Sequence, residues 1–144
     1  MTEAAYEFVE GAGGDLTFVA RGASLEELFT SAGEAVLAAC VEDPARVEPR
    51  ERFAIALAEP DCDLLLLRFL SELVFLRDAR RLLLRAGALR VQDDGSARLT
   101  GELCGERIDP ARHVLTHDVK AATAYGLRIE KSPAGLSVRV TLDV

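Results

Sequence analysis

The last nine residues alternate strictly between apolar and polar side chains, and this pattern constrains the fold more than any other. One face carries Leu136, Val138, Val140, Leu142 and Val144; the other carries Ser137, Arg139, Thr141 and Asp143. A period of two is typical of a β-strand with one buried face. The chain must therefore build a sheet that covers a core. We also expect the terminal carboxylate to lie beside the Asp143 side chain, and two close carboxylates need a cation or a basic neighbour.

Length and hydropathy indicate one globular domain, residues 1–144. The chain has 144 residues, of which 49% are hydrophobic, enough for one good core. The apolar run over 64–67 is followed at once by Arg68, so no stretch is long enough to cross a membrane. The first residues are acidic and lack an apolar signal core, so we expect a cytoplasmic protein.

Charge and cysteine content limit the classes of partner. The formal net charge of −7 disfavours direct binding to a nucleic-acid backbone, but an acidic surface can dock on a basic protein. The three cysteines are odd in number and form no C-x-x-C pair, so we expect buried small hydrophobic residues rather than disulfides or a zinc site. The chain contains only two lysines, Lys120 and Lys131.

Two helices are predicted in the first half of the chain. Ser24 and Glu27 form a capping-box pattern, and apolar residues then recur at helical spacing over Leu25–Cys40. The second helix, over Leu64–Leu76, is apolar nearly all round and should be mostly buried against a sheet. Asp61 or Asp63 can cap it.

Strand patterns surround these helices. Alternation predicts strands over 6–10, 16–20 and the end of 47–58, and a hairpin of 82–92 with 97–107 around a D-D-G-S turn. A terminal hairpin is predicted from alternation that begins near 119 and from the strand that starts at Leu136, around a Pro-Gly turn. The fold class is therefore α+β: two layers, with two helices packed on one larger mixed or antiparallel sheet.

Isolated polar residues allow simpler interpretations. Asp15 follows a glycine-rich loop at the start of a strand, where an Asp commonly bonds its own backbone in a turn.

His113 and His117 are four residues apart, but their segment does not have a helical pattern. On a strand this spacing separates them by about 13 Å, so a two-His metal site is not expected.

The ordered motifs of the chain resemble the archease family. They are Y-E-F-V-E, an Asp, G-x-S-L-E-E-L-F-x-x-A, L-S-E-L-V-F-L-x-D, D-P-x-R-H, V-K-A-x-T-x-x-G-L and a final V-R-V-T-L-D-V. The resemblance covers essentially the whole chain. It implies an archease-like fold and a protein that is not itself an enzyme. It further implies an activator of an RtcB-type RNA ligase, acting in tRNA splicing or RNA repair by promoting ligase guanylylation and multiple turnover.

The resemblance also implies a site. By position, Asp15, Asp143 and the carboxylate or backbone oxygen of Val144 would bind a divalent cation, and Lys120 would be the functional lysine of the V-K-A motif. Oxygen ligands suit a hard cation, Ca²⁺ first, with Mg²⁺ or Mn²⁺ as alternatives. So few ligands leave open positions for water or for groups of a partner.

The chain departs from the family pattern at two places. The usual E-H-T-A-D reads E-G-A-G-G-D, and the usual T-Y-H-G reads T-A-Y-G, so two histidine positions are empty. These losses motivate a second hypothesis, a binding or chaperone module for another RNA-modifying enzyme such as a methyltransferase. A small metal-dependent hydrolase has less support, because the sequence offers no nucleophile–base pair.

Overall fold

The computed structural model describes residues 5–11 and 13–144. The elements are, in order, β1 (Tyr6–Val9), β2 (Leu16–Gly22), α1 (Leu25–Cys40), the 3-10 helix η1 (Pro44–Arg46), β3 (Glu51–Glu59), α2 (Cys62–Arg80), β4 (Leu82–Asp93), β5 (Ala97–Arg107), β6 (Ala121–Ala122), β7 (Ile129–Ser132) and β8 (Gly135–Asp143). Helix α1 has the bounds predicted from the sequence. Helix α2 is longer than the predicted 64–76.

The helix ends follow from local capping. The Ser24 hydroxyl accepts from the Glu27 N–H at 3.2 Å, as the predicted capping box requires, whereas the Glu27 carboxylate accepts at 2.7 Å from the N–H of Ala23, one residue before the N-cap. Asp61 is the N-cap of α2, and its carboxylate accepts from the Leu64 N–H at 2.9 Å. Helix α2 ends where Arg81 adopts a left-handed conformation with φ 56°.

The strands form two antiparallel sheets. One has the order β1-β2-β8-β6, with β7 also paired to β8; the other has the order β3-β5-β4. The α+β class expected from the sequence is confirmed. The expectation of one larger sheet is corrected, because the β4–β5 hairpin pairs with β3 and has no ladder with the terminal strand. Strand β8 is central in the five-stranded sheet, with β2 on one side and β6 and β7 on the other.

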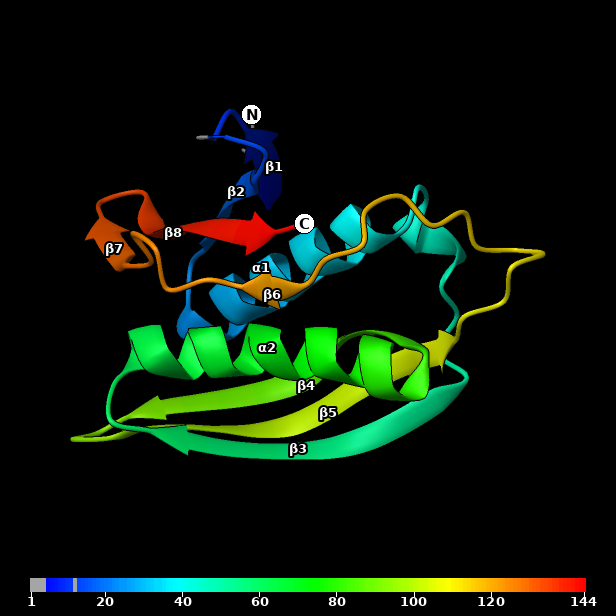
Figure 1. The fold of residues 1–144 in the computed structure, drawn as a ribbon. Helices are drawn as coiled ribbons and strands as arrows, with labels where there is room; N and C mark the ends of the chain where they lie inside the picture. The colour runs from blue at the N-terminus through cyan, green and yellow to red at the C-terminus, as the bar shows by residue number, and fades with distance from the viewer. Residues whose placement is uncertain (1–4, 12) are drawn as a thin grey trace.

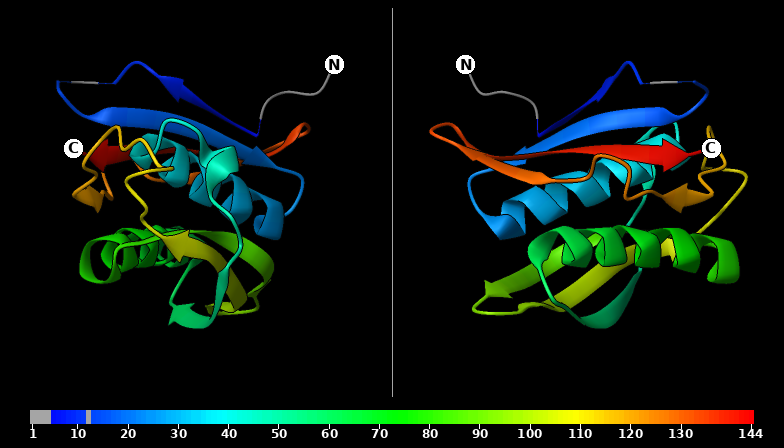
Figure 2. Two further views of the ribbon diagram at one scale, coloured as in Figure 1. Left: turned by 90° about the vertical axis from the view of Figure 1, so that its right-hand side faces the viewer. Right: turned by 60° about the vertical axis from the view of Figure 1, so that its left-hand side comes forward.

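Both helices lie between the two sheets (Figures 1 and 2). The rings of Phe29 in α1 and Phe69 in α2 meet at 5.8 Å, and both side chains are fully buried. Gly33 allows this approach, because a Cβ there would lie only 3.3 Å from the Phe69 ring. The position between two sheets explains why α2 is apolar on most of its surface. No helix in the part of the chain that the structure describes is long and apolar enough to cross a membrane.

The connection over 108–128 differs most from the sequence-based expectation. Only Ala121 and Ala122 form a strand here, so most of the alternation predicted from 119 onward does not become sheet. The backbone instead bonds the end of α1: Thr116 N–H donates to Cys40 O at 3.0 Å and His117 N–H to Ala39 O at 3.1 Å. These carbonyls would otherwise have no partner at the helix end, which explains why this segment leaves the sheet.

Candidate metal and partner site

The two aspartates predicted to bind a cation meet at one end of β8. The β2–β8 ladder ends with Leu16 opposite Leu142, so the same register continued by one residue places Asp15 opposite Asp143. Both residues are exposed. The preceding pair, Thr17 and Thr141, has its hydroxyl oxygens 3.4 Å apart, so residues of this parity share the face of the sheet away from the helices, although Thr17 itself is buried there. The register therefore brings the backbones of two residues distant in the sequence to the same end of β8, with their side chains on one face.

Lys120 reaches the same strand end from the other side. Its N–H donates to the Asp143 carbonyl at 2.7 Å, one residue before Ala121 pairs with Asp143. Paired residues point to the same face, so Lys120 shares a face with Val144, opposite that of Asp143. The Lys120 side chain accordingly lines a groove of about 420 Å³ against α2, together with Phe75, Asp78 and neighbours. The sequence-predicted residues are brought together by their backbones, with the lysine on the inner side.

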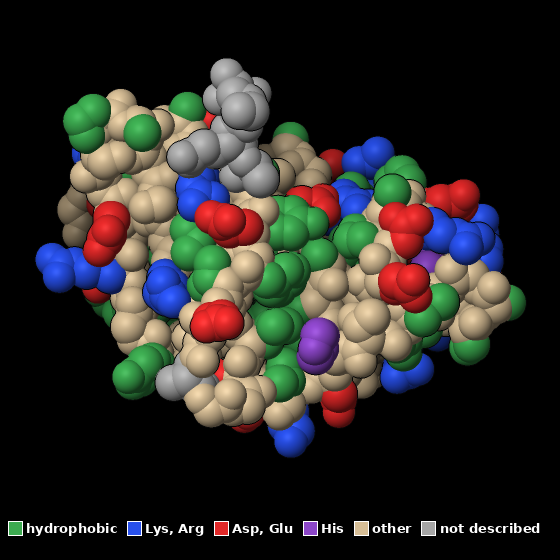
Figure 3. Space-filling model, turned by 90° about the horizontal axis from the view of Figure 1, so that it is seen from above, with side chains coloured by type: hydrophobic (Ala, Val, Ile, Leu, Met, Phe, Trp, Pro, Cys, Tyr) green, Lys and Arg blue, Asp and Glu red, His purple; other side chains and the backbone are tan. Residues whose placement is uncertain are grey.

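The available ligands suit an incomplete oxygen shell. Asp15 and Asp143 would supply carboxylates, and the main chain of Val144, the residue after Asp143, would add an oxygen. Within residues 5–11 and 13–144 there is no group of three or more His, Cys, Asp or Glu side chains that could hold a metal. A hard cation of six or more oxygen ligands would therefore keep positions open for water or for a partner. On the outer face of the sheet, acidic and basic side chains are interspersed among the described residues (Figure 3).

The two histidines have separate partners. His113 is buried; its Nδ1 accepts from the Asp109 N–H at 2.8 Å and its Nε2 lies 3.2 Å from Glu106. Because Nδ1 accepts, Nε2 carries the proton and donates to the carboxylate. His117 instead places Nδ1 3.2 Å from the Ala39 carbonyl.

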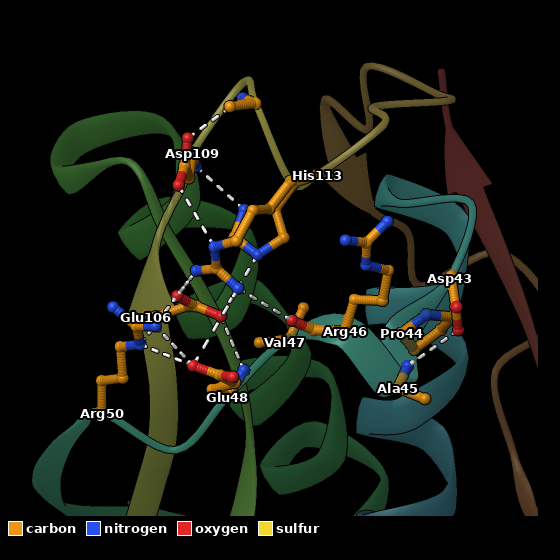
Figure 4. A network of polar contacts seen from close by, with 12 residues as sticks. Asp43, Pro44, Ala45, Arg46, Val47, Glu48, Arg50, Glu106, Asp109 and His113 are labelled. Atoms are coloured by element: carbon orange, nitrogen blue, oxygen red, sulfur yellow. Dashed lines mark hydrogen bonds and ion pairs between the residues drawn. The ribbon is translucent and has the colours of Figure 1, made fainter.

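A buried charge network was missed by the sequence analysis. Glu106, 4% exposed at its side chain, accepts from the Glu48 N–H at 2.6 Å and from Arg112, while Arg50 lies at 3.5 Å (Figure 4). Burial alone would raise the pKa of Glu106. The hydrogen bonds from Glu48, Arg112 and His113 outweigh burial and lower its pKa to about 2. The D-P-x-R-H motif supplies Arg112 and His113, but no local pattern identified Glu106 as their partner.

This network anchors the start of the 108–128 connection. It joins β5 through Glu106, the segment after η1 through Glu48, and the D-P-x-R-H turn. In the turn, the Ala111 N–H and the Arg112 guanidinium both bond Asp109 and lower its pKa. The connection that later carries Lys120 therefore begins from a fixed point.

Comparison with known proteins decides the family. The model of the archease protein family (MTH1598/TM1083) matches residues 6–144. The chain belongs to the archease family. Protein archease of Thermococcus gammatolerans is 36% identical over 115 residues, which cover 79% of this chain and 80% of the relative. Protein archease of Methanosarcina acetivorans is 28% identical over 142 residues, covering 96% and 95%.

Solved structures agree on the archease fold. The solution structure of protein 1598 of Methanobacterium thermoautotrophicum matches with a TM-score of 0.82 and 29% identity, over 97% of this chain and 99% of that one. A Thermotoga maritima archease, described as a possible chaperone, matches with a TM-score of 0.62 over 90% and 91%. Its identity of 14% supports the fold alone.

Proposed function

We propose that this archease activates an RtcB-type RNA ligase, promoting ligase guanylylation and multiple turnover with a bound divalent cation, and that it is not itself an enzyme. One observation carries the proposal: Asp15 and Asp143 flank the last pair of the β2–β8 ladder, Leu16 with Leu142, and the Lys120 backbone is bonded to the Asp143 carbonyl at the same strand end. A site of this kind, open on the outer face, suits transient contact with a partner's active site.

Asp15, Asp143 and the main-chain oxygen of Val144 would hold the cation, with Ca²⁺ first and Mg²⁺ or Mn²⁺ as alternatives. Such a cation supplies positive charge that neutralises phosphate oxygens. The incomplete shell leaves room for ligands from the ligase or its nucleotide. Lys120, a compact point charge on a flexible stem, would pair with a phosphate or carboxylate of the partner.

The first experiment is a multiple-turnover RNA ligation assay with GTP, a divalent cation, and an RtcB-type ligase from the same source. This protein is added in sub-stoichiometric amounts. Wild type should raise turnover, and Asp15→Ala, Asp143→Ala and Lys120→Met should each abolish most of the gain. Lys131→Met is the matched control, because it removes the only other lysine, which lies in β7 away from the site.

If the ligase depends on an activator and its turnover does not rise when the wild-type protein is added, the activator proposal is overturned.

The second candidate, a chaperone module for another RNA-modifying enzyme such as a methyltransferase, is favoured by the two family histidine positions that this chain fills with other residues. It predicts partner binding that is insensitive to chelator and to Asp15→Ala.

A further inference from the structure

The segment that carries Lys120 has little sheet structure to hold it. Strand β6 has two residues, and the preceding stretch bonds the end of α1. Lys120 itself is exposed, whereas Val119 beside it is 0% exposed. The orientation of Lys120 must therefore be set by contacts of the backbone around it.

The peptide group between Val119 and Lys120 is held on both sides. Its N–H, from Lys120, donates to the Asp143 carbonyl at 2.7 Å. Its carbonyl, from Val119, accepts from Nη2 of Arg77 at 2.7 Å. A peptide group is planar, and a hydrogen bond at each of its two polar atoms restrains its position and orientation, which limits the directions in which the Lys120 side chain can leave the backbone.

Arg77 is well placed to hold this peptide. It lies in the last turn of α2, is 9% exposed, and its guanidinium also bonds Asp78 and Asp118 at 2.7 and 2.9 Å and the Cys40 Sγ at 3.4 Å. Burial raises the pKa of the Cys40 thiol although Arg77 opposes this, so the sulfur faces the guanidinium as a neutral acceptor. The planar guanidinium group of arginine carries five N–H donors, so it can bond all of these acceptors at once. A lysine ammonium group has fewer donors and cannot.

We propose that Arg77 is the positioning residue for Lys120: it clamps the Val119–Lys120 peptide between α2 and β8 so that the lysine is held at the groove against α2, beside the end of β8. The importance of Lys120 rests on the proposed function; the clamp itself does not. Substituting Arg77 would leave a buried carbonyl without its partner and release the segment locally.

The two lysines allow a direct test by limited proteolysis of the native protein with a lysine-specific protease, read by mass spectrometry. Cleavage after Lys131, in β7, is the internal reference. In Arg77→Met, cleavage after Lys120 should accelerate about 10-fold relative to Lys131, the change expected for the loss of about 1.4 kcal/mol of local stability. Arg80→Met removes the same charge from an exposed position in the same helix turn and should leave the ratio unchanged.

Arg77→Lys keeps the charge and serves as a second variant if Arg77→Met fails to fold. It should raise the ratio as well, because the planar guanidinium group is lost. An unchanged ratio in the folded variant, or equal acceleration at both lysines, would overturn the clamp.

The RNA ligation assay supplies a second readout for Arg77, one that a purely structural role of this residue would not change. Arg77→Met should lower maximal turnover of the activated ligase, with no further loss when it is added to Lys120→Met, and should leave cation affinity unchanged. Full additivity of the two losses would count against positioning. If the wild type activates no ligase but the proteolysis ratio changes as expected, the proposed function fails and the clamp stands.

Discussion

Replacing Glu106 with glutamine should destabilise the protein to an extent that depends on pH. The network lowers the pKa of Glu106 from 4.5 to about 2. Each pKa unit corresponds to about 1.4 kcal/mol, so the ionised carboxylate contributes about 3 kcal/mol to the free energy of unfolding. Arg50 and Arg112 are partly exposed, and solvent screening reduces this to about 2–3 kcal/mol.

The sign follows from the lowered pKa. A carboxyl group that binds its proton more weakly in the folded state stabilises that state above its unfolded pKa, near 4.5, and loses this contribution as pH falls toward about 2. Glutamine resembles the protonated carboxyl. The stability gap between wild type and Glu106→Gln should therefore be constant above about pH 5.5 and should close on acidification.

Urea unfolding followed by circular dichroism measures this gap, since the chain has no tryptophan. Glu102→Gln is the matched control on the same strand, because its side chain is 50% exposed and meets Arg52 at 3.5 Å. It should change the free energy of unfolding by less than about 0.5 kcal/mol. A Glu106→Gln variant as stable as wild type near neutral pH, or a gap that persists undiminished in acid, would refute the reasoning.

The remaining predictions concern the cation site and the backbone. Asp143→Asn should weaken Ca²⁺ binding at least about 10-fold by calorimetry, yet leave the melting temperature of the metal-free protein unchanged, because the side chain is exposed; a large fall would contradict its assignment. Chelation should lower the melting temperature of wild type but not of Asp15→Asn, with about 2.7 kcal/mol lost when the cation had been present at 100 times its Kd. Gly101→Ala should cost at least about 2 kcal/mol in urea, because φ is 153° and a Cβ would meet the Ala88 carbonyl at 2.2 Å. Gly95→Ala, with φ 99° and open space, should cost about half as much; equal costs would show that the clash is relieved.

Much of the fold could be predicted because it depends on local patterns. Helix α1 begins and ends where the capping box and the apolar spacing predict, and β8 follows its period of two. The family resemblance implied Asp15 and Asp143 as ligands, and the ladder register continued by one residue sets them opposite each other, although no local pattern shows that these two strands pair.

The terminal alternation, the capping signals and the ordered motifs by themselves determined the α+β class, the helix positions and the residues at the end of β8. Tertiary structure alone decided that the strands divide between two sheets and that the 108–128 connection leaves the sheet for α1. It also supplied the partners of the buried charges: Arg77 bonds Asp118, 41 residues away, and Glu106 bonds the Glu48 backbone, 58 residues away. Sequence periodicity encodes which side of an element is buried, whereas the partner of a buried polar group depends on how distant segments pack, because each such group must find a hydrogen bond wherever the packed chain offers one.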